Sequence, residues 1–322
     1  MKRFAIGWVA ALGGLVAVAV ARFRRDDAAA RARLDAVRRS AVHTSAGEVE
    51  YADVGAGEPV LAVHGIFGGA DGGLLSFGHL VAHRRVIAPS RFGYLGSSMP
   101  EGATTAAQAD AFAELLDALA LDAVDVVAFS AGSVSALQFA VRHPDRVRHL
   151  VVMSGAWPGA FSKPPPSAEK LAYQSDVLMW LARTLAGPAL LRLVAGLPRT
   201  FPLTDDERAQ VVALLDSLFP VRERSAGIVF DAYTGNPDVD TFALEDIAVP
   251  TLVVHSRDDT LASFERAEAA AARIPHAQLL AHDTGGHLML GRDDETSRAV
   301  TAFLSSGGAA VGTVASSRRP RG

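Results

Sequence analysis

The stretch VDVVAFSAGS, residues 124–133, decides how this chain folds. A run rich in β-branched residues ends at Ser130, and the sequence after it has the pattern of an amphipathic helix. Ala128 and Gly132 stand two residues before and after the serine, where only a small residue fits between a strand and a helix that nearly touch. The stretch therefore predicts a strand, a tight turn and a helix, with the Ser130 hydroxyl raised clear of the sheet.

Strand and helix patterns alternate on both sides of this stretch, which predicts a mostly parallel, doubly wound sheet covered by helices on both faces. We expect helices over residues 104–121, 132–143 and 263–273 and a last helix that ends near residue 305. The expected strands are residues 48–54, 59–66, 84–89, 124–129, 149–155, 250–255 and 278–282.

The alternation stops at Trp157, and the sequence from there to about Asp246 has helical patterns only. These helices are expected over residues 167–185, 188–195, 204–219 and 225–233. The predicted organisation is thus an α/β core formed by residues 47–157 and 247–305, an all-helical cap of residues 158–246 inserted late in the sheet, and a disordered tail of residues 306–322.

The N-terminus has a different composition from the rest of the chain. Lys2 and Arg3 precede an uncharged apolar run over residues 4–21, and Arg22, Arg24 and Arg25 follow it. At about 1.5 Å per residue such a helix just crosses a bilayer core of about 30 Å. We therefore expect residues 1–25 to form a transmembrane-like anchor, with residues 26–46 as a linker.

A cleaved signal peptide is the alternative reading of the N-terminus, because small residues suited to cleavage occur at residues 17–19 and 19–21. The protein would then be exported rather than membrane-associated. If the run is an anchor, the larger number of arginines on its C-terminal side favours a cytoplasmic catalytic domain.

Composition excludes several other classes of function. The 322 residues carry a formal net charge of -4 and no basic stripe in the globular part, so no nucleic-acid partner is expected. There is no cysteine, and the histidines show no metal-ligand spacing. The glycine-rich residues 68–73 lack the Lys-Ser/Thr of a phosphate-binding loop. We expect neither a metal nor a cofactor.

A neutral serine needs a base to accept its proton and an acid to orient that base. In a parallel sheet such groups lie at the carboxyl ends of the strands. The last expected strand is followed by Asp-Thr-Gly-Gly and then His287, and the strand before it is followed by Asp258 and Asp259. The candidate set is Ser130, His287 and one of these two acids.

This order of serine, acid and histidine resembles the α/β-hydrolase superfamily, and the resemblance extends from about residue 48 to residue 305. Residues 63–66, Val-His-Gly-Ile, resemble the family's HG turn, and residues 90–98 resemble its glycine-rich loop. The resemblance implies that Asp259 is the orienting acid. It also implies that the backbone N–H groups of Ile66 and Ala131 form the oxyanion hole, and that His64 is structural.

The function implied is a serine hydrolase that cleaves a carboxylic ester or a related acyl bond through an acyl-enzyme. Carbon–carbon bond hydrolysis, amide or peptide cleavage and cofactor-free perhydrolysis use the same triad and remain alternatives. A non-catalytic binding module on the same scaffold is a more distant one. The substrate is expected to be a small, apolar acyl compound, because the cap is rich in aromatic and apolar residues and has no cluster of basic ones.

Overall fold

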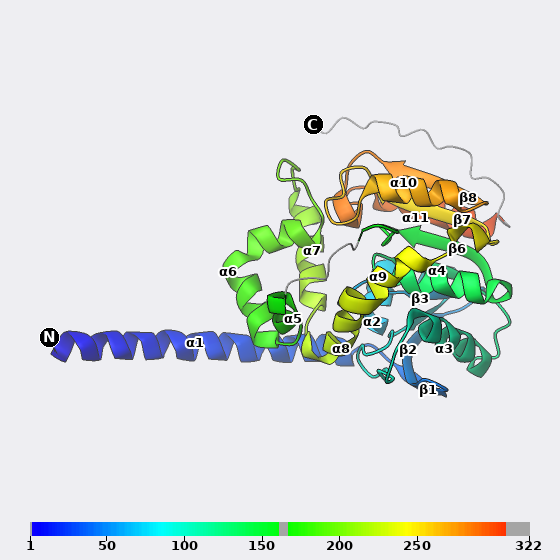
Figure 1. The fold of residues 1–322 in the computed structure, drawn as a ribbon. Helices are drawn as coiled ribbons and strands as arrows, with labels where there is room; N and C mark the ends of the chain where they lie inside the picture. The colour runs from blue at the N-terminus through cyan, green and yellow to red at the C-terminus, as the bar shows by residue number, and fades with distance from the viewer. Residues whose placement is uncertain (1, 161–166, 307–322) are drawn as a thin grey trace.

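The computed structural model describes residues 2–160 and 167–306, with the side chains of residues 13–160 and 170–306. Its centre is one sheet with the strand order β1-β2-β4-β3-β5-β6-β7-β8 (Figure 1). The strands are β1 (Ser40–Thr44), β2 (Gly47–Gly55), β3 (Pro59–Val63), β4 (Arg85–Pro89), β5 (Val124–Phe129), β6 (Val147–Met153), β7 (Thr251–Ser256) and β8 (Ala277–His282). Strands β3 to β8 are parallel, and β1 and β2 form an antiparallel edge.

Helices cover both faces of this sheet, as the alternating sequence pattern predicts. One face packs against α3 (Thr105–Ala118), α4 (Gly132–Arg142) and α10 (Phe264–Arg273). The other face packs against α2 (Ala70–Phe77) and α11 (Asp293–Ser305). The central strands are therefore buried on both sides, which explains why their sequences are continuous apolar runs rather than alternating ones.

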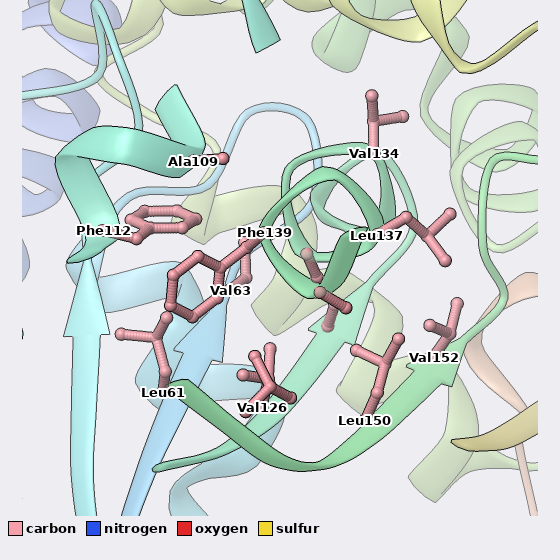
Figure 2. Close-up of a cluster of buried hydrophobic side chains, with 14 of the residues drawn as sticks. Leu61, Val63, Ala109, Phe112, Val126, Val134, Leu137, Phe139, Leu150 and Val152 are labelled. Atoms are coloured by element: carbon pink, nitrogen blue, oxygen red, sulfur yellow. The ribbon is translucent and has the colours of Figure 1, made fainter. Parts of the chain in front are cut away.

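Figure 2 shows the larger of the two cores, between the sheet and helices α3 and α4. Val126 and Leu150 of neighbouring strands point toward Phe139 and Leu137 of α4, and all four side chains are fully buried. Phe112 of α3 meets Phe139 edge to face, with ring centroids 5.9 Å apart. This packing fixes α4 against β5, and with it the turn that carries Ser130.

The cap between β6 and β7 is helical, as predicted, although its helices begin and end at other residues. It contains α5 (Ser167–Tyr173), α6 (Asp176–Val194), α7 (Asp205–Ser217), α8 (Ser225–Phe230) and the single turn α9 (Asn236–Asp238). The expected break near residue 186 is present as a kink, because the backbone of Ala186 is not helical and the helix resumes after it through Pro188. A second break, which was not expected, lies at Ser175, whose side chain accepts a hydrogen bond from the Leu178 amide.

The sheet begins at Ser40, so part of the expected linker is an edge strand. Residues 26–35 of the expected linker belong to one long helix, α1 (Lys2–Asp35). Its C-terminal part lies against the body, where Ala30 and Leu34 are buried, while its N-terminal part projects from the body (Figure 1). The tail after Ser306 lies outside the described residues.

Among the described residues, one helix has the length and composition to cross a membrane, and it is α6 rather than α1. Leu15, Val16, Val18 and Val20 of α1 are nevertheless exposed. The side chains of residues 4–12, the first half of the predicted anchor, lie outside the described part of the chain.

Candidate active site

Ser130 occupies a strained turn between β5 and α4. Its φ is 52°, a left-handed conformation that costs a non-glycine residue roughly 1–2 kcal/mol. The Ser130 amide donates to the Met153 carbonyl at 2.9 Å, and the Ser133 amide donates to the Ser130 carbonyl at 2.9 Å. These bonds hold the turn in place, so the strained conformation is fixed by its neighbours.

Gly132 allows this turn to close. A Cβ atom at position 132 would lie 2.4 Å from the His64 carbonyl oxygen and 2.7 Å from that of Val63, and both are backbone atoms that cannot swing aside. The sequence pattern predicts a small residue at both flanking positions. The structure accommodates the methyl group of Ala128, which is fully buried in β5, but leaves no room for one at Gly132.

We expect Gly132→Ala to lower the free energy of unfolding by roughly 1–3 kcal/mol, because the added methyl group overpacks a backbone contact. Urea unfolding followed by circular dichroism measures the change. Gly78→Ala is the matched control, because a Cβ atom there meets nothing within 4 Å. Equal stability of the two variants would contradict this account of the turn.

His287 reaches Ser130 from the loop after β8. Gly285 and Gly286 have φ values of 137° and 62°, which only glycine adopts readily, and they turn the chain back over the sheet. The Nε2 atom of His287 lies 2.9 Å from Ser130 Oγ. Its Nδ1 atom lies 2.8 Å from Oδ2 of Asp259. Three residues far apart in the sequence thus form one continuous chain of hydrogen bonds.

The two adjacent acids after β7 have different partners. Asp259 faces His287, and its Oδ1 atom accepts the amides of Leu261 at 2.8 Å and Ala262 at 3.0 Å. Asp258 accepts the Gly286 amide at 2.8 Å, so it supports the backbone of the histidine loop rather than the imidazole ring. The geometry therefore assigns the contact with His287 to Asp259 and leaves Asp258 outside the chain of hydrogen bonds.

The turn at residues 64–66 lies beside Ser130. An ideal Cβ at Gly65 would be 3.1 Å from Ser130 Cβ. Among the described residues, the amides of Ile66 and Ala131 donate to no protein acceptor, so both are free to bind a ligand oxygen.

His64 has a structural role at this turn. It accepts the Arg91 amide at Nε2 and donates from Nδ1 to the Gly65 carbonyl at 2.7 Å. Burial, together with the charge of Arg91, holds its pKa well below its ordinary value, so the ring is neutral.

A cavity of about 530 Å³ opens above Ser130 between the core and the cap. Its lining contains Ser130, His287 and the charged side chain of Arg183. The other lining residues are Ile66, Phe67, Phe129, Tyr173, Met179, Leu190, Leu193, Val194, Leu214, Leu215, Leu218, Phe219, Leu261 and Leu288. Such a cavity suits an apolar molecule with one polar group at the serine end.

Comparison with known proteins places these features in one family. The family model of the alpha/beta hydrolase fold matches residues 58–293, which include Ser130, Asp259 and His287. This chain belongs to the α/β-hydrolase family. The match begins just before β3 and ends at the start of α11, so it covers the core on both sides of the cap as well as the cap itself.

Two curated relatives of this α/β-hydrolase are 30% identical to it. They are the 2-hydroxy-6-oxo-2,4-heptadienoate hydrolase of Pseudomonas putida, over 74% of this chain and 86% of its own length, and the protein named carbamate hydrolase RutD of Serratia proteamaculans, over 66% and 78%. Among solved structures, an alpha/beta hydrolase fold protein from Nakamurella multipartita is 32% identical, with a TM-score of 0.62, over 84% of this chain and all of its own.

His255 is a residue of this α/β-hydrolase site to which the sequence analysis gave no role. It lies on β7, and its Nε2 atom is 3.0 Å from the Ala262 carbonyl oxygen and 3.3 Å from Oδ2 of Asp259. The ring is fully buried, so its contact with Asp259 is shielded from water. Its place at the end of a strand, four residues before the acid, was the only signal in the sequence.

The Asp259 carboxyl is ionised in this setting. Burial alone would raise its pKa, but the charge of His287 and hydrogen bonds from His255, His287 and the Ala262 amide outweigh burial and hold the pKa well below 3.8. Among the described residues, no group of three or more His, Cys, Asp or Glu side chains is arranged to hold a metal ion.

A lowered folded-state pKa of Asp259 makes stability depend on pH in a defined direction. The ionised carboxylate stabilises the fold above its ordinary pKa of 3.8, and this contribution is lost as the pH falls through the lower folded-state value. We expect Asp259→Asn to destabilise the protein at neutral pH, with the difference from wild type shrinking in acid. Urea unfolding over a pH series measures this difference; growth of the difference on acidification would contradict the assignment.

Proposed function

We propose that this α/β-hydrolase cleaves a carboxylic ester through a Ser130–His287–Asp259 triad and an acyl-enzyme. The observation that carries the proposal is the continuous chain of hydrogen bonds from Ser130 Oγ through His287 to Asp259, with contacts of 2.9 and 2.8 Å. A serine in hydrogen-bond contact with an imidazole that is itself oriented by a buried carboxylate is an activated nucleophile.

The reaction proceeds in two acyl-transfer steps. Ser130 Oγ attacks the ester carbonyl carbon as its proton passes to His287 Nε2, and His287 then donates that proton to the departing alkoxide. The acyl group is left on Ser130. Water, deprotonated by His287, attacks the acyl-enzyme and releases the acid. Asp259 accepts the hydrogen bond from Nδ1 throughout and stabilises the imidazolium form.

The negative charge that develops on the carbonyl oxygen needs donors already in position. The amides of Ile66 and Ala131 are assigned this role. Ala131 follows Ser130 in the chain, Ile66 lines the same cavity as Ser130, and neither amide has a protein acceptor among the described residues. The loss of one such donor typically raises the barrier by about 3–4 kcal/mol, or roughly a hundred- to a thousand-fold in rate.

The decisive test is labelling with a fluorophosphonate probe, located by mass spectrometry of the labelled peptide. A serine hydrolase is modified at Ser130. A non-catalytic binding module on the same scaffold remains unlabelled, and that result would refute the proposal.

Carbon–carbon bond hydrolysis is the second candidate, because one relative at 30% identity is named 2-hydroxy-6-oxo-2,4-heptadienoate hydrolase. Both reactions use the same triad, so labelling does not separate them. The two reactions are separated by a panel of substrates that contains p-nitrophenyl esters, a dienoic diketone, an amide and a carbamate. A preference for the diketone over every ester would replace the leading proposal.

The apolar cavity predicts how activity depends on acyl-chain length. Val194, the last residue of α6, lines the cavity, and a phenyl ring at this position would occupy part of its volume. We expect Val194→Phe to lower kcat/KM for long-chain p-nitrophenyl esters about tenfold, a loss equal to the burial of one to two methylene groups. The acetate ester should react at close to the wild-type rate. An equal loss for short and long esters would indicate damage to the triad instead.

The N-terminal helix is the proposed membrane anchor of the enzyme, through residues 4–21. The exposed apolar side chains of residues 15–20 and the projection of this part of α1 from the body support the proposal (Figure 1). Signal cleavage after Ala21 is the alternative, and it would leave the docked residues 22–35 in place. Fractionation with a high-salt wash, followed by intact mass measurement, distinguishes an uncleaved integral protein from a cleaved soluble one.

A further inference from the structure

Helix α6 presents an apolar surface that no other described part of the protein covers. Within the most apolar 18-residue stretch of this helix, only 11% of the residues are buried. Between Val177 and Leu191 the one charged residue is Arg183, and that side chain is paired with Asp216. The exposed side chains on this surface are Val177, Leu178, Leu181, Leu185 and Leu193, which we call the apolar face of α6. Soluble monomers rarely expose contiguous apolar surface of this kind.

Both ends of α6 are fixed to the body, which prevents this helix from crossing a bilayer. At its N-terminus, Asp176 accepts the amides of Val221 at 2.6 Å and Arg222 at 3.1 Å. Just past its C-terminus, the Ala195 carbonyl accepts the His287 amide at 2.9 Å. A helix held in this way can only lie along a surface.

The contacts between α1 and α6 indicate that this surface is the membrane that α1 would enter. Trp180 of α6 donates to Asp26 at 3.0 Å, and its ring meets Phe23 edge to face at 5.7 Å. Asp26 lies five residues beyond the end of the apolar run, which is roughly 7–8 Å along the helix. In Figure 1, α6 forms the edge of the body from which the N-terminal part of α1 projects. The apolar face of α6 is therefore at the level where α1 would leave the lipid.

The same face extends to the rim of the cavity above Ser130. Leu193 lines that cavity and is 59% exposed, so one side chain belongs to both surfaces. Arg183 and Phe219 line this cavity and also a groove of about 420 Å³ between α1 and the cap. The cavity from Leu193 to Ser130 is thus lined mostly by apolar side chains, whereas charged side chains such as Arg22, Asp27 and Arg33 line the groove beside α1.

We propose that the apolar face of α6 lies in the interfacial layer of the bilayer that anchors α1, and that the ester substrate reaches Ser130 from that leaflet past Leu193. The proposed route of the substrate rests on the proposed function, whereas the proposed contact of α6 with lipid does not. The occupant of this face is a lipid surface, because the exposed apolar side chains of α6 lie at the edge of the body from which the apolar part of α1 projects. Exposed Arg22 and Arg25 follow the apolar run at the headgroup level.

Contact with lipid can be measured without reference to catalysis. The chain has no cysteine, so Leu185→Cys, Leu15→Cys and Leu75→Cys each provide a single site for a fluorescent label. These leucines are 81%, 69% and 51% exposed, and Leu75 lies on α2 of the core. The labelled full-length proteins are reconstituted in vesicles of phosphatidylcholine with a minority of phosphatidylglycerol and nitroxide-bearing lipid.

We expect strong quenching at positions 15 and 185 and little at position 75. Quenching at position 15 alone would overturn the proposal for α6, and quenching at neither would overturn the anchor as well. A label at position 185 that is shielded from both lipid nitroxide and aqueous iodide would mean that a second copy of the chain covers this face, which also contradicts the proposal.

The route of the substrate is tested with a double variant, Val177→Asn with Leu185→Asn, because neither residue lines the cavity. We expect its hydrolysis of a long-chain ester embedded in vesicles to fall about tenfold, while hydrolysis of a soluble short-chain ester changes less than about twofold. The matched control is Leu75→Asn with Val212→Asn, two exposed apolar residues outside this face. Equal activity of the two double variants on vesicles would refute entry from the leaflet. If wild type hydrolyses neither ester, the proposed function fails, whereas the quenching result still stands.

Discussion

Replacement of Ser130 by alanine should reduce kcat/KM for p-nitrophenyl esters by about four to six orders of magnitude. The imidazole of His287 then has no hydroxyl to deprotonate, and no acyl-enzyme can form. Loss of any one member of a triad removes nearly all of the benefit of the whole set, because the three groups act as a unit. The residual rate comes from substrate binding and the oxyanion donors alone.

Ser135→Ala is the control for this variant. Ser135 is a buried serine one turn further along α4, away from the chain of hydrogen bonds. We expect it to retain near-wild-type turnover and full labelling by the fluorophosphonate probe. Turnover by Ser130→Ala within tenfold of wild type would show that another nucleophile carries the reaction, and the assignment of the site would fail.

Asp259→Asn should lower kcat by about four orders of magnitude, while Asp258→Asn should lower it less than about tenfold. An amide at position 259 can donate to His287 Nδ1 instead of accepting from it, which turns the imidazole into the wrong tautomer for accepting the Ser130 proton. Asp258 contacts only the backbone of the histidine loop, so its loss loosens that loop without reversing a hydrogen bond at the ring.

Steady-state kinetics of the two variants on one ester measures this contrast, and circular dichroism shows whether each variant is folded. A larger loss in Asp258→Asn than in Asp259→Asn would exchange the roles of the two acids. Equal losses of kcat in the two variants would indicate that either substitution disorders the whole histidine loop. The separate roles assigned to Asp258 and Asp259 would then be wrong.

Local sequence patterns were enough to predict most of the sheet. The strands from β3 to β7 are short apolar runs because they are buried on both faces, and such runs are visible without knowledge of their neighbours. β1 was missed for the opposite reason. It is a five-residue edge strand with mostly exposed side chains, so its sequence carries little hydrophobic signal, and it is a strand only because β2 pairs with it.

The cap was harder to predict than the core. Pro188 and Gly187 favour a helix break in the sequence, and the structure has a kink beside them at Ala186. The break at Ser175 was missed, because the first turn of α6 is held by the contacts of Asp176 with the amides of Val221 and Arg222, which are distant in the sequence. Propensity is a weak local preference, and tertiary contacts override it. The position of α6 beside α1 could not be predicted for the same reason, since it depends on contacts such as that between Trp180 and Asp26.

The sequence by itself determined the strand–serine–helix turn, the order of serine, acid and histidine, and the presence of a helical insertion. Each follows from local patterns of residue types and from the order in which these patterns occur along the chain. Only the tertiary structure decided which acid contacts His287, because Asp258 and Asp259 are neighbours with identical side chains and differ only in the direction that the turn gives them. The tertiary structure also placed His255 against the acid and α6 beside α1, because contacts between distant segments form only when the whole chain packs.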